Sequence, residues 1–157
     1  MKIEKYLQQS PVFALYRAQG ALIDHLQNLL KKNDLHLLQA LILTALFFED
    51  AEIRPRDLAK TFQVSNSTLS HALHGLEKRS LVIRSLHPSD ARGYLIHTTG
   101  VGKKKALTLV KLFDKIQEEL ETQMGVRSFR DFVRTLDKLI SVYRLAFSQT
   151  GRLSSFD

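Results

Sequence analysis

The sequence predicts a mainly α-helical fold with one small β-hairpin, and three observations support this prediction. Apolar residues recur at helical spacing along most of the 157 residues. One segment, residues 81–98, departs from that spacing and combines β-branched residues with a cluster of turn-forming residues. The chain has only three prolines and seven glycines, which favours long regular elements. The order of helices, hairpin and further helices is that of a winged helix-turn-helix with long helices at both ends.

The first part of the chain predicts two consecutive helices. Ser10-Pro11 opens the first, because serine caps helix N-termini and proline suits the first helical position. Asn33-Asp34 breaks this helix, and the second, over 35–48, is apolar on nearly all sides, so we expect it to be buried. The apolar stripe of the first helix comprises Phe13, Tyr16, Leu22, Ile23, Leu26, Leu29 and Leu30.

The next segment has helix-turn-helix spacing. A short helix over 54–62 is followed by a turn at Gln63-Val64 and a helix from 65 to about 79. Ala59 is small, which lets the second helix cross closely above the first. The residues expected to face inward are Leu58, Ala59 and Val64, and on the second helix Leu69, Ala72, Leu73 and Leu76.

The rest of the chain predicts a hairpin and two long helices. Strands are expected at 81–83 and 94–98 around a turn at 87–93, and helices at 103–124 and 127–148 separated by Gly125. We therefore divide one structural domain into an N-terminal dimerisation helix (1–34), a winged helix-turn-helix region (35–100), C-terminal dimerisation helices (101–150) and a tail (151–157).

The terminal helices carry more apolar surface than one small winged domain can cover. Such stripes usually indicate a partner, and the commonest partner is a second copy of the chain. We expect a homodimer whose interface includes Phe13, Tyr16, Phe132, Leu136, Leu139, Tyr143 and Phe147.

Charge and composition limit the function classes. The net charge is +7, and residues 51–105 hold ten basic and four acidic residues, so almost all of the excess lies in the middle of the chain. A basic patch confined to one region is expected at a polyanion site, although a solvated basic face gives the same pattern. The lack of cysteine excludes disulfides, thiolate zinc sites and thiol redox sensors. No signal peptide or membrane span is evident, so we expect a cytoplasmic protein.

The second helix of the helix-turn-helix exposes short polar side chains, as a helix that enters the DNA major groove must. The alternative is a well-capped surface helix that has no role in DNA binding. Serine and threonine hydroxyls and the helix N-terminus suit phosphates. The candidate residues on this helix are Ser65, Asn66, Ser67, Thr68, Ser70, His71 and His74, and the candidate phosphate contacts are Arg54, Arg56, Lys60, Lys78 and Arg84.

The hairpin adds a candidate for the minor groove. Arg92, near the tip, suits a narrow minor groove, which attracts arginine. Asp90, two residues earlier, can pair with Arg92 or with a basic residue near the second helix of the helix-turn-helix, and so hold the orientation of the arginine. The alternative is an ordinary exposed turn with an ion pair of little energetic value.

Three motifs in order resemble the MarR (multiple antibiotic resistance regulator) family. They are Leu76-Glu77-x-x-x-Leu81-Val82, Pro88-x-Asp90-x-Arg92 and Thr99-x-x-Gly102. The resemblance implies a triangular homodimer that binds a palindromic operator and acts as a ligand-responsive repressor, less often as an activator. It also implies that Ser67, Thr68, Ser70 and His71 meet bases or phosphates, that Arg92 meets the minor groove and that Asp90 supports the wing.

The same resemblance implies a small aromatic or lipophilic effector between the dimerisation helices and the winged domain. Phe13, Tyr16, Phe47 and Phe48 either line such a site or belong to the core. No cofactor is expected.

The sequence departs from the family pattern in several places. Gln63 and Ser80 stand where glycine is usual, and a left-handed conformation at Gln63 costs about 1 kcal/mol or more. His87 replaces an aspartate, Thr98 an apolar residue and His71 an arginine. With no arginine on the first turns of the second helix, direct reading of guanine is expected to be modest.

Four other functions compete with DNA binding. A protein-interaction module on a winged-helix frame is the strongest, but it does not need the clustered basic charge. An enzyme lacks support, because no nucleophile elbow, phosphate-binding glycine loop or paired carboxylates occur. Six histidines allow metal sensing. A separate hypothesis, which is compatible with DNA binding, is that His71 and His74 contact DNA in a pH-dependent way. A membrane-surface role needs a basic amphipathic helix, which the charge pattern does not provide.

Overall fold

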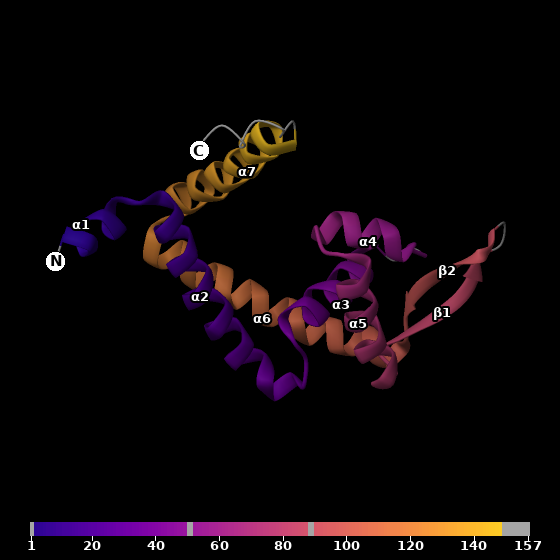
Figure 1. Cartoon of the computed structure of the whole chain (residues 1–157). Coiled ribbons are helices and arrows are strands. Elements are labelled where there is room, and N and C mark those ends of the chain that lie inside the picture. Colours follow the sequence, from indigo (N-terminus) through magenta and orange to yellow (C-terminus); the bar gives the residue numbers. More distant parts are fainter. Residues whose placement is uncertain (1, 50–51, 88–89, 149–157) are drawn as a thin grey trace. The chain divides into compact units, whose positions relative to one another are not determined.

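A computed structural model describes the backbone of residues 2–49, 52–87 and 90–148, and the side chains of 3–49, 52–87 and 93–144. The chain forms two compact units, residues 1–110 and 111–157. The helices are α1 (Lys2–Gln9), α2 (Pro11–Leu30), the 3-10 helix η1 (Lys31–Asn33), α3 (Leu37–Glu49), α4 (Pro55–Phe62), α5 (Asn66–Lys78), α6 (Gly100–Met124) and α7 (Val126–Ser148). One antiparallel hairpin joins β1 (Val82–His87) to β2 (Asp90–Thr98) (Figure 1). The predicted fold class is confirmed.

The N-terminal helices begin and end where short side chains allow it. The N–H of Phe13 donates to the Ser10 hydroxyl at 3.3 Å, and Pro11 occupies the first position of α2, as predicted. Asp34 adopts a left-handed conformation with φ 53°, which ends η1 and turns the chain toward α3. The short helix α1 was not predicted, since Lys2–Gln9 carries only isolated apolar residues.

Helix α3 forms the centre of the first unit. Its buried residues are Gln39, Ala40, Ile42, Leu43 and Leu46, and the helix contacts α2, α5 and β2. The expected buried helix is found, although Phe48 near its end is 67% exposed. Among the residues whose side chains the structure describes, Gln39 is the one buried polar residue in this otherwise apolar core.

The helix-turn-helix follows its sequence signals closely. Gln63 ends α4 with φ 53°, the left-handed conformation for which glycine is usual, and its N–H bonds to the Ala59 and Lys60 carbonyls. Ser65 then caps α5 by accepting the Thr68 N–H at 3.0 Å. All of the predicted inner residues except the half-exposed Val64 are buried: Leu58, Ala59, Leu69, Ala72, Leu73 and Leu76.

The hairpin is longer than the sequence indicated. The strands pair from Val82↔Thr98 to Leu86↔Tyr94, and after an irregularity His87 pairs with Asp90. The expected turn over 87–93 was therefore too long, because β1 extends to His87 and β2 begins at Asp90, which pairs with His87. Ile53 adds an unpredicted bridge to Ile96 through two backbone hydrogen bonds of 3.4 and 2.9 Å.

The motif Thr99-x-x-Gly102 has a direct structural cause. The Thr99 hydroxyl accepts the Gly102 N–H at 2.9 Å and donates to the Ser80 carbonyl at 2.7 Å. These two hydrogen bonds hold the first turn of α6 beside the residues that follow α5. Gly102 lies so close to the Leu81 carbonyl that a Cβ there would be 1.9 Å from the oxygen. Ser80 adopts φ 55°, in keeping with the glycine usual at this position.

The second unit contains the distal part of α6 and all of α7. Gly125, with φ 79°, ends α6 as predicted, and the Phe129 N–H bonds to its carbonyl at 2.9 Å. Among the helices of the described residues, none is long and apolar enough to cross a membrane.

The close approach at Gly102 gives the first testable prediction. Gly102→Ala should lower the free energy of unfolding by roughly 2 to 3 kcal/mol, because backbone atoms cannot yield as a flexible side chain can. Gly100→Ala is the matched control, since a Cβ at Gly100 meets nothing within 4 Å, and its effect should stay within about 0.5 kcal/mol. Urea unfolding followed by circular dichroism compares the two, and equal stabilities would contradict this account.

Candidate nucleic-acid interface

The outer face of α5 presents the predicted polar side chains to solvent. These exposed residues are Asn66, Ser67, Ser70, His71 and His74. At the start of the helix, the Ser65 and Thr68 hydroxyls lie 2.8 Å apart, so each already has a partner in addition to any phosphate it meets. The structure thus brings the candidate base-reading residues together on one face, around the N-terminal turns of the helix.

The rotation of α5 is fixed by an apolar inner face and by one polar contact with α3. Leu69, Leu73 and Leu76 are buried. The Gln39 side chain accepts the His36 N–H at 3.1 Å and donates to the Ala72 carbonyl at 3.5 Å. Gly75 makes room for it, because a Cβ there would lie 2.1 Å from the Gln39 side-chain nitrogen. Sequence reasoning missed this contact, although a glycine inside an amphipathic helix was the available signal.

Arg84 links the hairpin to α5. Its Nε and Nη2 donate to the two carboxylate oxygens of Glu77, the second at 2.8 Å. Its guanidinium also lies 4.5 Å from the centre of the Tyr94 ring, within range of a cation–π interaction. A phosphate contact was predicted for Arg84, but this geometry commits its main donors to Glu77 and favours a positioning role.

Other basic residues of the region differ in how they are engaged. Arg54 Nη2 donates to His87 Nε2 at 2.6 Å, which ties the start of α4 to the end of β1. Arg56 has a 66% exposed side chain and only a long 3.9 Å pair with Asp57. Lys60 and Lys78 are exposed. Arg56, Lys60 and Lys78 therefore have the most accessible charges among the predicted phosphate contacts.

Arg79 has a structural partner. Its Nε donates to Asp34 at 3.0 Å and its Nη1 to the Gly75 carbonyl at 2.9 Å. The hydrogen bond and the charge of Arg79 hold the pKa of Asp34 below its ordinary value. The contact joins the end of α5 to the turn that precedes α3.

The predicted wing residues are described only in part. The backbone of Asp90 and Arg92 lies in β2, and their side chains lie outside the described residues, as does Pro88. The minor-groove role of Arg92 and the supporting role of Asp90 therefore stay predictions.

The histidines form no metal cluster within the part of the chain that the structure describes. His97 Nε2 lies 2.6 Å from the Ser85 hydroxyl and 3.7 Å from Glu52, inside the hairpin region. His71 and His74 are exposed on α5, so their pH-dependent contact with DNA stays a prediction.

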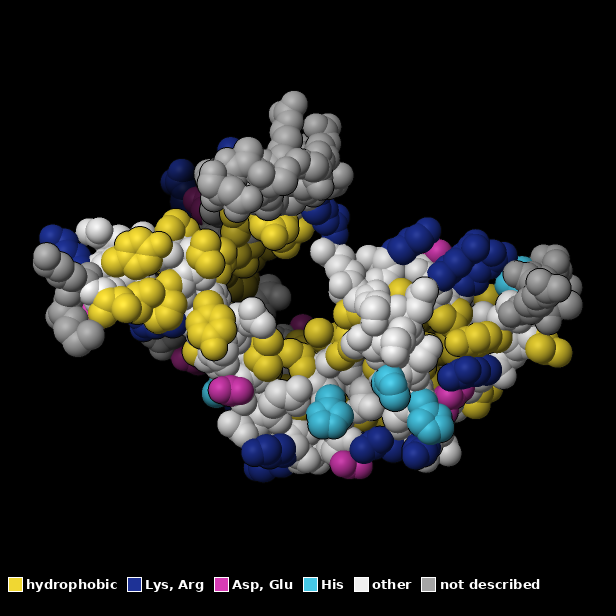
Figure 2. Space-filling model, viewed as in Figure 1, with side chains coloured by type: hydrophobic (Ala, Val, Ile, Leu, Met, Phe, Trp, Pro, Cys, Tyr) yellow, Lys and Arg dark blue, Asp and Glu magenta, His cyan; other side chains and the backbone are white. Residues whose placement is uncertain are grey.

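The predicted dimerisation residues are largely uncovered in a single chain. Tyr16 is 72% exposed in the first unit, while Phe132, Leu139 and Tyr143 are exposed in the second. Phe13 and Leu136 are half-buried, and the Phe147 side chain lies outside the described residues. Figure 2 shows hydrophobic side chains gathered over α1 and α2. Of the four aromatic residues that were expected either to line an effector site or to belong to the core, Tyr16 and Phe48 are mostly exposed and so are not core residues of the single chain. Phe13 and Phe47 are half-buried.

Comparisons with known proteins agree with this architecture. Residues 35–94 match the model of the MarR family. The chain is 26% identical over 136 residues to the HTH-type transcriptional regulator SarZ of Staphylococcus aureus, covering 87% of this chain and 90% of that protein. Its fold is similar to that of S. aureus MepR in a MepR–DNA complex, with a TM-score of 0.78, 22% identity and coverage of 85% and 98%. The transcriptional regulator BldR from Sulfolobus solfataricus matches with a TM-score of 0.73, 22% identity and coverage of 90% and 98%.

The winged helix-turn-helix segment of this chain, residues 35–94, is similar to the MarR family, and the similarity to SarZ extends over most of the chain. The resemblance inferred from the three motifs is confirmed. MarR-type proteins are DNA-binding transcription regulators without catalytic activity, so the enzyme alternative is excluded.

The engagement of Arg84 gives the second prediction. Arg84→Ala should weaken DNA binding about tenfold, because the hairpin loses its tie to α5, yet leave the dependence of affinity on salt unchanged. Lys78→Ala, at an exposed position at the end of α5, should instead lower the slope of log affinity against log salt by about 0.9, as expected for one lost phosphate contact. Fluorescence anisotropy at several salt concentrations measures both. An equal loss of slope in the two variants would return Arg84 to the phosphate contacts.

Proposed function

We propose that this chain acts in the cytoplasm as a homodimeric transcription repressor that binds a palindromic double-stranded DNA operator. The observation that carries the proposal is the two-faced helix α5. Its inner face is buried, its outer face exposes short polar side chains, and it lies in the region that holds almost all of the excess positive charge. A helix of this kind suits the major groove.

Base reading is assigned to the exposed face of α5. Asn66, Ser67, Ser70, His71 and His74 are within one helical surface, and asparagine can bond adenine through two hydrogen bonds. The segment Asn66–Leu76 contains no arginine or lysine, so bidentate recognition of guanine has no donor there. We therefore expect an operator whose half-sites favour A·T pairs under the first turns of α5.

Affinity is assigned to phosphate contacts around this helix. Arg56, Lys60 and Lys78 supply accessible charges, Ser65 and Thr68 supply hydroxyls, and the first amides of α5 point toward the same anions. Arg54 contributes from the start of α4. Arg92, with Asp90, is assigned to the minor groove beside the site, where a narrow groove concentrates negative potential.

The exposed apolar helices support a second copy of the chain as partner. Isolated proteins rarely expose so many large apolar side chains on neighbouring helical turns, and α1, α2 and α7 all do. A two-fold dimer presents two α5 helices with opposite polarity, which is why a palindromic operator follows. A small aromatic or lipophilic effector that relieves repression completes the proposal, supported by the paired rings Phe13–Tyr16 and Phe47–Phe48.

Sequence-specific binding is the third prediction. The chain should bind the DNA upstream of its own gene more tightly than an unrelated duplex, and the affinity for both should fall steeply with salt because counterions are released. Fluorescence anisotropy at two salt concentrations tests this, and footprinting then gives the half-site spacing. Weak and equal binding to a panel of upstream duplexes would favour the protein-interaction module instead.

Dimerisation through α7 is the fourth prediction. Leu139→Asp places a carboxylate on the apolar stripe that includes Phe132 and Tyr143, so the dimer should dissociate and operator affinity should fall at least about tenfold. Ser141→Asp is the matched control on the opposite, polar face, where the Ser141 hydroxyl bonds to the Asp137 carbonyl. Sedimentation velocity measures the oligomeric state, and a Leu139→Asp variant that stays dimeric would move the interface away from this stripe.

A further inference from the structure

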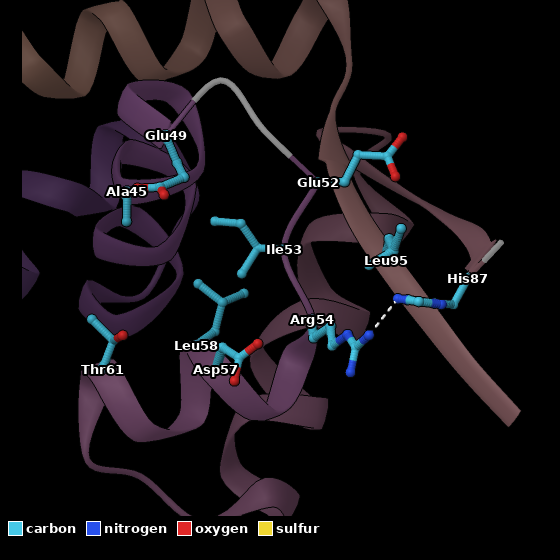
Figure 3. Close-up of a pocket in the computed structure, with 10 residues that line it drawn as sticks. All are labelled: Ala45, Glu49, Glu52, Ile53, Arg54, Asp57, Leu58, Thr61, His87 and Leu95. Atoms are coloured by element: carbon cyan, nitrogen blue, oxygen red, sulfur yellow. Dashed lines mark hydrogen bonds between the residues drawn. The ribbon is translucent and has the colours of Figure 1, made fainter. Parts of the chain in front are cut away.

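Arg54 and His87 hold the far end of the hairpin against the start of α4. Arg54 Nη2 donates to His87 Nε2 at 2.6 Å, and Figure 3 shows the two side chains meeting across the space between these segments. His87 is the last residue of β1 and lies beyond the regular ladder, which ends at Leu86↔Tyr94. This contact is therefore closer to the tip of the hairpin than the Ile53↔Ile96 bridge is.

The backbone places Arg54 for this contact. Both the N–H and the carbonyl of Ile53 bond to Ile96 of β2, so the segment before α4 runs beside the hairpin. Pro55 disfavours a helical conformation in the residue before it, and Arg54 is extended, with φ −74° and ψ 137°. The Arg54 side chain makes no capping hydrogen bond to α4, which leaves its guanidinium for His87.

The chemistry of the contact determines the protonation state of His87. A guanidinium only donates hydrogen bonds, so the nitrogen that it meets must carry a lone pair. His87 Nε2 is therefore the acceptor, and the imidazole is neutral with its proton on Nδ1. A protonated imidazole has an N–H on both nitrogens, which would set donor against donor and bring two positive charges together. The contact and the protonated ring exclude one another.

The other charged groups near His87 do not prevent this release. Those that line the same cavity are Arg54 and Asp57 at the start of α4, Glu52 before it and Glu49 at the end of α3. On β2, Asp90 pairs with His87 through the backbone, and on β1 itself Arg84 is bonded to Glu77. The carboxylates attract a positive ring and Arg54 repels it, so protonation moves the His87 ring away from Arg54.

His97 offers a comparison within the same hairpin. Its Nε2 lies 2.6 Å from the Ser85 hydroxyl and 3.7 Å from the Glu52 carboxylate. A hydroxyl can accept as well as donate, and a carboxylate attracts a positive ring, so both contacts survive protonation. Acid therefore opens the contact of His87 and strengthens the contacts of His97.

We propose that Arg54 and His87 are positioning residues that orient the tip of the hairpin for DNA, and that their contact makes operator binding depend on pH. This inference rests on the proposed function. Histidine changes its charge between about pH 5 and 8, so the contact is present in mildly alkaline solution and lost in mildly acidic solution. Arg92 lies two residues beyond Asp90, the backbone partner of His87. Loss of the contact leaves Arg92 poorly positioned, and operator affinity falls as the pH falls.

The sign of this dependence separates it from the charge of the DNA-binding face. Protonation of His71 and His74, which are exposed on α5, adds positive charge beside DNA and strengthens binding in acid. Loss of the Arg54–His87 contact weakens binding in acid. Variants at position 87 isolate the second effect, because the other five histidines are the same in each protein.

Nitrogen-15 NMR of the histidine rings, in the full-length protein without DNA, tests the contact directly. At about pH 8 the His87 ring should carry its proton on Nδ1, and His87→Gln, which lacks the ring, assigns its signals. On acidification to about pH 5.5 the Arg54 Nε–H signal should shift with the same midpoint as the His87 ring. This shift should be absent from His87→Glu, whose carboxylate reaches as far as Nε2 and stays ionised. A proton on Nε2 at the higher pH, or an Arg54 signal that ignores the His87 titration, would overturn the proposal.

Operator anisotropy at the same two pH values tests the consequence. Between about pH 8 and about pH 5.5, wild-type affinity should fall roughly threefold to tenfold relative to that of His87→Glu, the factor that one hydrogen bond of ordinary net strength represents. His97→Gln is the matched control in the same hairpin and should keep the wild-type dependence on pH, since glutamine can still bond to Ser85.

The two measurements separate the possible failures. A constant ratio of wild-type to His87→Glu affinities would overturn the positioning role even where NMR finds the contact. Loss of the pH dependence in His97→Gln would also overturn it, because the titrating group would then be His97. Failure of the wild-type protein to bind any DNA would overturn the proposed function, while NMR would still decide the Arg54–His87 contact.

Discussion

The burial of the inner face of α5 is the constraint on which the rest of the structure depends. Leu69, Leu73 and Leu76 are buried, and each such side chain contributes roughly 1.5 to 3 kcal/mol relative to exposure. A helix with one apolar face has one favourable rotation, so the opposite face is determined at the same time. Gln39 and Gly75 sharpen this choice, because the amide fits only where the glycine leaves room. The polar face that meets DNA is thus specified mainly by the residues that never touch it.

The elements next to α5 are joined to it by polar contacts of small individual energy. An exposed ion pair such as Glu77–Arg84 usually adds little stability, but two parallel hydrogen bonds and the Tyr94 ring restrict its geometry. After the C-terminal end of α5, the Thr99 hydroxyl donates to the Ser80 carbonyl and Gly102 lies against Leu81. The start of α6 is therefore fixed beside the end of α5. These contacts fix the positions of the hairpin and of α6 relative to α5, and a DNA-binding surface depends on such fixed positions.

Local signals were readable from the sequence, and distant partners were not. The caps at Ser10 and Ser65, the left-handed Gln63 and the stop at Gly125 each follow from a few neighbouring residues. The extent of β2 was missed because pairing with His87 outweighs the turn preference of Asp90. Arg84 was assigned to phosphates because charge alone cannot reveal that Glu77, seven residues earlier, lies across from it. The polar Gln39 in an apolar helix likewise needs the tertiary structure to explain it.

The arginine-poor recognition helix and the exposed terminal helices support one another as features of a dimer. Short polar side chains on Asn66–His74 allow few bidentate base contacts, so one winged domain gains limited discrimination. Joining two such domains makes the second binding event intramolecular, which raises both affinity and the requirement for two correctly spaced half-sites. The apolar residues of α2 and α7 are costly to leave in water unless a partner covers them. In the proposed dimer, a chain that reads each half-site weakly therefore depends on its terminal helices for specificity as well as for stability.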